Sequence, residues 1–314
     1  ECANDIVKLL LIYYARGDGD WERKDKMKGV VCFLPMALSA VVSLNAAVVR
    51  TNDVCYLEGE DLASADAYRM EMCKVDVELA QGAVGLPVLV WLHGGGLTRG
   101  GKGLLPLKCK DKIVQVGVGY RLMGRNGITS GDGPLSDAAA AIAWTFRHAV
   151  KYGGDPAKVF VSGSSAGGYL TMMVGMDPKW LGRHGFKTSD LAGLAPNSGQ
   201  VTTHFAIKEF RGDRRLGLVP VIDEYAPLWH VTNWKDIPPI VCIVGSPPWE
   251  WEGRAEENEL LVGTLKGLGH KRAWYVRLPF ANHARTMIFG VGYIEGFVLG
   301  QYPDDLHLSG EGRR

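Results

Sequence analysis

Residues 158–170 decide the fold of this chain, and they read Lys158-Val159-Phe160-Val161-Ser162-Gly163-Ser164-Ser165-Ala166-Gly167-Gly168-Tyr169-Leu170. A short run of β-branched and aromatic residues ends in Gly-x-Ser-x-Gly, and a helical pattern rich in Ala, Gly, Leu and Met follows at once. This order predicts a strand, a very tight turn and a helix, with Ser165 at the apex of the turn. The flanking glycines keep strand and helix from colliding, and the helix N-terminus supplies free N–H groups. Ser165 is therefore our candidate nucleophile.

The composition of the whole chain is that of a globular protein with one α/β domain and insertions. The chain has 314 residues, of which 46% are hydrophobic and 22% charged. Its 41 glycines far exceed the average share of about 7%, which suits many tight strand–helix connections. The net charge of +1 gives no reason to expect nucleic acid or an anionic surface as a partner.

The cysteines do not form a recognisable metal or disulfide pattern. There are six, at positions 2, 32, 55, 73, 109 and 242, with no paired spacing. Neither a zinc site nor a dense disulfide framework follows from that arrangement, and one or two disulfides remain open. We expect no metal ion and no cofactor.

Residues 1–50 predict an upstream segment followed by a signal peptide. The basic patch 23–28 precedes an apolar run at 30–42, and small residues follow around 45–47. These are the three parts of a secretory signal peptide, which we place at about residues 27–47, with Met27 as a natural start. The sequence therefore predicts a secreted or periplasmic protein.

An N-terminal membrane anchor is the alternative interpretation of the same residues, because the apolar run continues to Val49. Arg50 ends it, and Pro35, Ser39 and other polar residues interrupt it before 18 clean apolar residues are reached. We favour cleavage and expect no stable membrane insertion after processing.

From about residue 54 the chain alternates strands and helices. The expected strands are Met70–Leu79 (half-exposed, near a sheet edge), Leu86–Leu92, Lys112–Tyr120, Leu191–Ala195, Pro239–Gly245 and Ala273–Leu278. The expected helices besides the one after Ser165 are Ser136–Lys151, Arg254–Leu268 and about Ala284–Gly300. Such alternation predicts a mostly parallel sheet covered on both faces, with ligands at the carboxyl ends of its strands. We place this domain at residues 51–302 and a flexible tail at 303–314.

A second glycine-rich run, His93-Gly94-Gly95-Gly96, follows directly after the predicted buried strand Leu86–Leu92. Successive glycines let backbone N–H groups turn inward and form a small anion pocket, which an acyl-transfer enzyme needs for its oxyanion. The overlapping Gly96-x-x-x-x-Gly101-Lys102 resembles a phosphate-binding loop, but Gly103 stands where Ser or Thr must hold magnesium.

Five motifs stand in the order seen in α/β-hydrolase esterases. They are Trp91–Gly96, Gly119–Leu122, Asp137–Trp144, Gly153–Pro156 and Gly163–Gly168. Over roughly residues 66–300 the chain resembles the hormone-sensitive-lipase-like carboxylesterases and the feruloyl- and acetyl-esterase-like enzymes. The resemblance implies an α/β-hydrolase fold, a mostly parallel central sheet flanked by helices with a small lid insertion.

The resemblance also implies roles for individual residues. It makes Ser165 the nucleophile, and it assigns the oxyanion hole to Gly95 and Gly96 together with the N–H of Ala166. Asp137 would be structural, bracing the loop after Tyr120.

A serine hydroxyl is a poor nucleophile until a base takes its proton. His283 follows the last predicted strand and precedes the last helix, where these esterases place their histidine. The acid should stand about three residues past Gly245, but Pro248 occupies that place. Glu250 is the nearest carboxylate, and Glu252 and Asp223 remain alternatives. The chain order of Ser165, Glu250 and His283 agrees with this fold.

Between Met176 and Pro238 lies more chain than a strand–helix unit needs. Within it, residues 201–236 carry His204, Phe205, Phe210, Tyr225, Trp229 and Trp234. We predict a small lid that provides an apolar acyl or aromatic pocket over the site.

Together these features predict a serine carboxylesterase that hydrolyses short acyl or aryl esters through an acyl-enzyme on Ser165. Acetyl or feruloyl esters on polysaccharides are included among its substrates. Because Pro248 replaces the expected acid, a hydrolase-fold binding protein that has lost catalysis is the alternative. A peptidase or thioesterase on the same scaffold is a third hypothesis.

Overall fold

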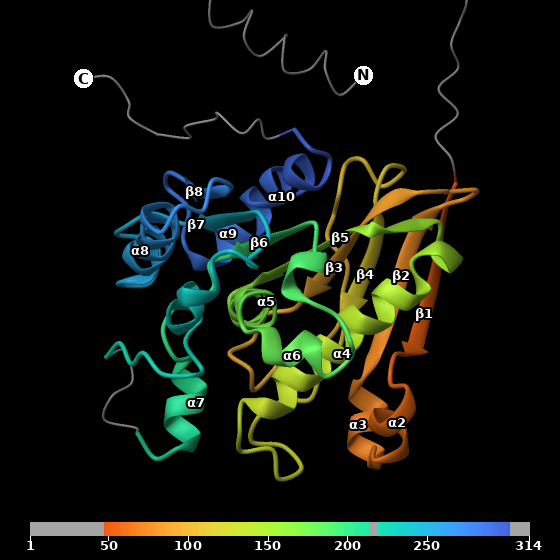
Figure 1. The fold of residues 1–314 in the computed structure, drawn as a ribbon, viewed down its shortest axis with the longest axis horizontal. Helices are drawn as coiled ribbons and strands as arrows, with labels where there is room; N and C mark the ends of the chain where they lie inside the picture. The colour runs from red at the N-terminus through yellow and green to blue at the C-terminus, as the bar shows by residue number, and fades with distance from the viewer. Residues whose placement is uncertain (1–46, 214–218, 302–314) are drawn as a thin grey trace, which may run out of the picture. The chain divides into compact units, whose positions relative to one another are not determined.

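The computed structural model describes residues 47–213 and 219–301, which are drawn in colour in Figure 1. The predicted signal peptide, apart from Ala47, and the predicted tail lie outside these residues. An eight-stranded sheet in the order β1-β2-β4-β3-β5-β6-β7-β8 forms the centre of the domain. Its strands are β1 (Val48–Cys55), β2 (Lys74–Ala80), β3 (Leu86–Leu92), β4 (Val114–Val118), β5 (Gly154–Ser164), β6 (Gly193–Asn197), β7 (Ile240–Val244) and β8 (Ala273–Arg277).

The sheet is mostly parallel. β2 pairs antiparallel with β1 and with β4. The pairs from β4 through β3, β5, β6 and β7 to β8 are all parallel. The carboxyl ends of these parallel strands share one edge of the sheet, and this edge brings together the loops that follow β3, β5, β7 and β8. The mostly parallel sheet predicted from the strand–helix alternation is confirmed.

Helices cover both faces of the sheet (Figure 1). The longer ones are α4 (Asp132–His148), α5 (Ala166–Met176), α8 (Arg254–Gly267) and α10 (Val291–Val298). The shorter ones are α2 (Gly59–Ala63), α3 (Ala67–Met72), α6 (Pro178–Gly182), α7 (Phe205–Phe210) and α9 (His283–Phe289).

The domain has two hydrophobic clusters, and the alternation of side chains along β3 explains why. Val88 and Val90 belong to the same hydrophobic cluster as residues of α4, α5 and α8. Leu89 and Trp91 belong to a second cluster that includes residues of α10. Because successive side chains of a strand point to opposite faces, a continuous apolar run buries both faces at once.

The N-terminal part of the sheet differs from the prediction. A half-exposed strand was expected at Met70–Leu79, but Ala67–Met72 is the helix α3 and the strand begins at Lys74. The strand lies near a sheet edge, as expected, but it is mostly buried, because β1 pairs along its outer side. The strand can bury the charged residue Asp76 because the Asp76 carboxylate pairs with Arg50 and Lys102.

The predicted last helix, Ala284–Gly300, is two helices, α9 and α10, which meet at Gly290. A Cβ atom at Gly290 would lie 2.4 Å from the side-chain nitrogen of Asn197 at the end of β6. This close approach brings the break between the helices against the sheet end near the candidate nucleophile.

Cys55, Cys73 and Cys242 carry free thiols.

Within residues 47–213 and 219–301, no helix combines the length and the apolar character needed to cross a membrane.

Candidate active site

Ser165 lies at the turn between β5 and α5, as the motif predicted. Its backbone has φ 56° and ψ −114°, a positive φ that is rare for a residue with a side chain. The turn is held by a hydrogen bond from the N–H of Ser165 to the carbonyl of Asn197, at 2.8 Å. Strain of this kind costs on the order of 1–3 kcal/mol and persists only where the surrounding structure fixes it.

Three of the predicted site residues form one hydrogen-bonded chain. The Oγ of Ser165 lies 2.9 Å from Nε2 of His283, the first residue of α9. On the other side of the ring, Nδ1 of His283 lies 2.7 Å from Oε1 of Glu250, in the loop after β7. With Glu250 ionised, Nδ1 carries the proton that it donates to the carboxylate, and Nε2 is free to accept from the serine hydroxyl.

Glu250 is buried and its carboxylate is surrounded by donors. Besides His283, the donors are the hydroxyl of Ser198, the hydroxyl of Thr286 at 3.4 Å, and the N–H groups of Gly245 at 3.3 Å and Trp251 at 2.9 Å. Burial alone would raise the pKa of this carboxyl, but the hydrogen bonds from His283 and Ser198 and the nearby imidazole outweigh it and lower the pKa to about 2. The group is therefore ionised throughout the neutral range.

The two alternative acids lie elsewhere. Glu252 is an exposed residue of the turn before α8. Asp223 accepts hydrogen bonds from the Thr203 hydroxyl and the Tyr225 N–H and pairs with Arg211, so it holds the 201–236 segment together. Of the three carboxylates considered, Glu250 is the one in contact with His283.

The loop after β3 lies against the serine turn. A Cβ atom on Gly94 would lie 3.5 Å from Cβ of Ser165, which shows how closely the two backbones approach. The next residue, Gly95, has φ 117°, a conformation that other residues rarely adopt. The hydroxyl of Tyr120 donates to the His93 carbonyl at 2.7 Å, and the two rings stack with centroids 4.1 Å apart. This contact fixes the start of the loop.

The segment 201–236 contributes Phe205 to the site. Its ring is 3.1 Å from where a Cβ of Gly96 would lie, and its centroid is 6.2 Å from that of Trp251. His204 is buried and accepts a hydrogen bond from the Ala206 N–H at the start of α7. His204 therefore has a structural role in this segment. That the segment forms a lid over the site stays a prediction.

Sequence reasoning missed two residues of the site. The ring of Trp251 stacks on His283, with centroids 4.4 Å apart and planes 15° from parallel. Ser198 is fully buried at φ 51° and donates to Glu250. The position of Trp251 one residue after the candidate acid was the one available signal, since a loop that brings the acid to the histidine brings its neighbours too.

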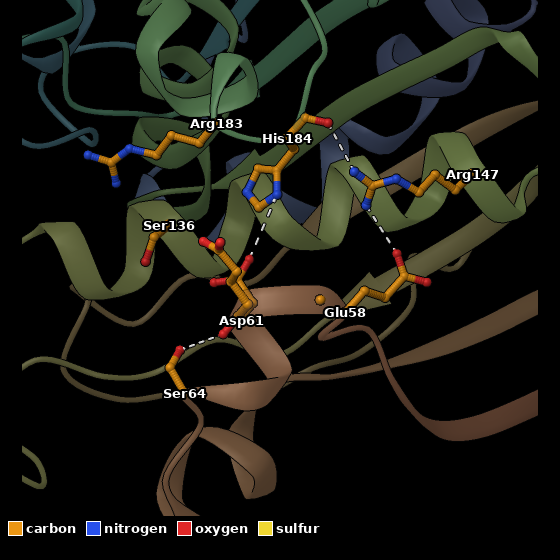
Figure 2. A pocket seen from close by; sticks show the side chains of 9 residues that line it. Glu58, Asp61, Ser64, Ser136, Arg147, Arg183 and His184 are labelled. Carbon is orange, nitrogen blue, oxygen red and sulfur yellow. Dashed lines mark hydrogen bonds and ion pairs between the residues drawn. The ribbon is translucent and has the colours of Figure 1, made fainter.

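The structure also contains a polar pocket of about 760 Å³ that includes none of the predicted site residues (Figure 2). It lies among α2, α4 and the end of α6. Some of its polar groups contact one another: Arg147 bridges to Glu58, and His184 lies 3.8 Å from Asp61. Among the described residues, no cluster of three or more His, Cys, Asp and Glu side chains could hold a metal ion.

The comparisons with known proteins begin with a protein-family model. A family model described as BD-FAE matches residues 75–228. These residues run from β2 to the 3₁₀ turn before β7, and they include both glycine-rich motifs and Ser165.

The curated relatives match a shorter part of the chain. Liver carboxylesterase B-1 of Rattus norvegicus is 36% identical over 103 residues, which is 30% of this chain and 18% of the relative. The chain thus spans about a fifth of the length of the curated relatives it matches.

Solved structures cover most of the chain at low identity. Esterase 2 of Thermogutta terrifontis, phosphoramylated by tabun, matches with a TM-score of 0.57 and 19% identity over 79% of this chain and 94% of that one. A truncated carbohydrate esterase from gut microbiota matches with a TM-score of 0.58 and 13% identity over 82% and 97%. The chain has the α/β-hydrolase fold, as its motifs predicted.

Proposed function

We propose that this chain is a serine carboxylesterase that hydrolyses short acyl or aryl esters through an acyl-enzyme on Ser165. The observation that carries the proposal is the chain of two short contacts, Ser165 to His283 at 2.9 Å and His283 to Glu250 at 2.7 Å. A nucleophile, a base and an orienting acid within hydrogen-bond reach are the arrangement that acyl transfer requires.

The first half of the reaction forms the acyl-enzyme. The Oγ of Ser165 attacks the ester carbonyl carbon while its proton passes to Nε2 of His283. When the tetrahedral intermediate collapses, the bond to the alcohol oxygen breaks, and His283 returns the proton to that oxygen. In the second half, after the alcohol has left the pocket, water attacks the acyl carbon while one of its protons passes to Nε2 of His283. The bond from the acyl carbon to Oγ of Ser165 then breaks, and His283 returns the proton to Oγ, so that the carboxylic acid and the free Ser165 hydroxyl result.

Glu250 orients the base without itself changing protonation. Its low pKa keeps the carboxylate charged, so it accepts a hydrogen bond from Nδ1–H of His283 and stabilises the imidazolium that forms during each proton transfer. The dense set of donors around it leaves the carboxylate little freedom to turn away from the ring.

The oxyanion is assigned to the backbone N–H groups of Gly95, Gly96 and Ala166. Ala166 is the first residue of α5, where N–H groups have no partner inside the helix and the dipole favours negative charge. The approach of Gly94 to Ser165 supports the placement of the neighbouring loop N–H groups beside the reacting carbon.

Acetyl or feruloyl esters of polysaccharides are the narrower substrate class that we propose. The likeness to a carbohydrate esterase supports it, and Phe205 and Trp251 offer aromatic walls to an aryl group. The alternative of a binding protein without catalysis rested on Pro248, and the contact of Glu250 with His283 removes its motive.

The test is hydrolysis of a p-nitrophenyl ester series from acetate to octanoate, together with methyl ferulate and acetylated xylan. We expect turnover of the short p-nitrophenyl esters and of at least one of the last two. Absence of hydrolysis of every ester by folded protein would favour the binding-protein hypothesis, and cleavage of peptides or thioesters alone would favour the third.

We also propose that the protein is secreted or periplasmic. The support is the basic and then apolar pattern of residues 23–47, and β1 begins at Val48, directly after the expected cleavage region.

A further inference from the structure

Asn197, the last residue of β6, lies between the strands that lead to the candidate nucleophile and the candidate acid. Its backbone is paired on one side with Ser164, which precedes Ser165, and on the other with Ile243 of β7, the strand before Glu250. The side chain is fully buried. A polar side chain in such a place needs partners, and those of Asn197 belong to the elements that carry the site.

Asn197 contacts both the serine turn and the helix that carries the histidine. Its backbone carbonyl accepts the N–H of Ser165 at 2.8 Å. Its side-chain Nδ2 donates to the carbonyl of Thr286 at 3.0 Å. Thr286 follows His283 by three residues on α9, a spacing at which two residues of a helix are neighbours. One residue therefore connects the element of the nucleophile to the element of the base.

The contact between Asn197 and α9 leaves no room for a side chain at position 290. A Cβ atom there would lie 2.4 Å from Nδ2 of Asn197 and 2.8 Å from the carbonyl oxygen of Thr286. Such distances force neighbouring groups to move in a close-packed interior. The amide of Asn197 can reach Thr286 because residue 290 is glycine.

The hydrogen bond from Asn197 to Thr286 explains the geometry of the site better than it explains stability. Oδ1 of Asn197 is buried and has no hydrogen-bond partner in the part of the chain that the structure describes, which is unfavourable. The Thr286 carbonyl also accepts the N–H of Gly290 at 2.8 Å, so it would stay bonded without Asn197. An apolar residue of similar volume should therefore cost little stability. It could not hold α9 against the serine turn by a hydrogen bond.

From these contacts we propose that Asn197 is a positioning residue that sets the distance between Ser165 and His283. Because Asn197 holds both elements, Oγ of Ser165 and Nε2 of His283 stay 2.9 Å apart, within reach for proton transfer. The inference rests on the proposed esterase function. It adds a buried residue that acts through the nucleophile and the base.

Asn197→Leu tests the role, since it keeps the volume of the side chain and removes the hydrogen bond to Thr286. A small misplacement of reacting groups is costly, so kcat for p-nitrophenyl acetate should fall about 10–100-fold. KM and the urea midpoint should change little, because Asn197 is buried away from the substrate. Labelling of Ser165 by a fluorophosphonate should slow by a similar factor. A residue with a purely structural role would change the urea midpoint and leave kcat unchanged.

The matched control is Asn258→Leu. Asn258 is also fully buried, and its Oδ1 also has no partner within the described residues. Its Nδ2 donates to the carbonyls of Gly199 and Arg254, and not to the serine turn or α9. This control should keep the kcat of the unsubstituted protein.

Gly290→Ala disturbs the same contact from the other side and decides the question if Asn197→Leu does not fold. The added methyl group would push Nδ2 of Asn197 away from Thr286, so kcat should fall while KM holds. Gly292→Ala is its control, because no described atom beyond its own helix lies within 4 Å of that Cβ position. This control should keep full kcat.

Crystal structures of the unsubstituted protein and Asn197→Leu give a measurement without turnover. The distance from Ser165 Oγ to His283 Nε2 should exceed about 3.5 Å in the variant, beyond a hydrogen bond. Unchanged kcat in folded Asn197→Leu, an equal fall in Asn258→Leu, or a rise in KM alone would overturn the proposal. Failure of the unsubstituted protein to hydrolyse any ester would instead contradict the esterase function, and the two crystal structures would still decide whether Asn197 positions His283.

Discussion

Glu250 is held more firmly than any other candidate side chain of the site. Its carboxylate accepts from Ser198, Thr286 and two backbone N–H groups while it contacts His283. Such a cage leaves one orientation for the acid, and the acid in turn leaves one orientation for the ring. The tautomer of His283 that can accept the serine proton follows from this.

Replacing this acid by its amide tests the arrangement. Glu250→Gln keeps the volume but removes the charge that stabilises the imidazolium, so kcat for p-nitrophenyl acetate should fall on the order of 10²–10⁴-fold. Steady-state kinetics measure it. Glu252→Gln should keep full activity, and Asp223→Asn should lower thermal stability more than kcat, because Asp223 accepts from Thr203 and pairs with Arg211. Equal losses in Glu250→Gln and Glu252→Gln would contradict the assignment.

The low pKa of Glu250 also predicts how stability depends on pH. The folded pKa is about 2, below the value of about 4.3 expected for an unfolded chain. The carboxylate therefore contributes stability that is complete above the unfolded pKa and is lost as the pH falls through the folded pKa. Urea unfolding between pH 6 and pH 2.5 should show the unsubstituted protein losing more of its unfolding free energy than Glu250→Gln. Parallel curves would refute this.

At this scale the sequence predicted the nucleophile and the histidine more readily than the acid. Ser165 belongs to a local motif, and His283 follows a recognisable strand. Pro248 stands where the acid was expected, so Glu250 could be chosen only as the nearest carboxylate. Ser198 could not be predicted, because its contact with Glu250 joins the ends of different strands. Trp251 was signalled only by its place next to the candidate acid.

The element that positions the nucleophile is the β5–turn–α5 unit. A Cβ on Gly167 would lie 1.9 Å from the carbonyl oxygen of Leu92, the last residue of β3. The start of α5 is therefore packed directly onto the backbone that leads into the oxyanion loop. The two glycine-rich motifs, far apart in sequence, meet at this contact.

Two glycine-to-alanine changes separate this contact from ordinary helix propensity. Gly167→Ala should cost about 1–3 kcal/mol or more by overpacking and should lower kcat, because the helix start must move. Gly263→Ala, in the exposed middle of α8 with no atom within 4 Å of its Cβ position, should raise stability by about 0.5–1 kcal/mol. Denaturant titrations and kinetics of both variants give the comparison. Unchanged stability in Gly167→Ala would argue against the close packing.

Elements with continuous apolar runs were predicted well, and those with mixed patterns were not. β3, β7 and β8 fall within a residue or two of their predicted ends, because strands buried on both faces have a clear signature. The helix α3 was hidden inside a polar–apolar alternation that resembles a strand. The division into α9 and α10 depends on the contact of Gly290 with Asn197, which involves a distant strand.

On the scale of the whole molecule, the described domain and the predicted signal peptide occupy separate parts of the chain. The described domain begins with β1 at Val48, and the predicted signal peptide precedes it in the chain. The order of motifs predicted the α/β-hydrolase fold because five local patterns in a fixed order identify a topology. Acyl and alcohol preference could not be predicted, since it depends on side chains that the tertiary fold collects.

The N-terminus of the mature protein tests the export prediction. Mass spectrometry of protein recovered outside the cytoplasm should find a chain that begins between about residues 40 and 50, as a signal peptidase would leave it. Expression of the same gene with Lys28, the basic residue directly after Met27, replaced by Gln is the control and should reduce export. A chain that keeps residues 27–47 and stays in the membrane fraction would favour the anchor.

The nucleophile itself gives the most direct test of the central claim. The purified protein is treated with a fluorophosphonate, and the adduct is located by intact mass and peptide mapping. The account predicts one adduct per chain on Ser165, no labelling of Ser165→Ala, and a fall in kcat of about 10⁴-fold in that variant while it stays folded. An adduct on another residue, or ester hydrolysis retained by Ser165→Ala, would contradict it.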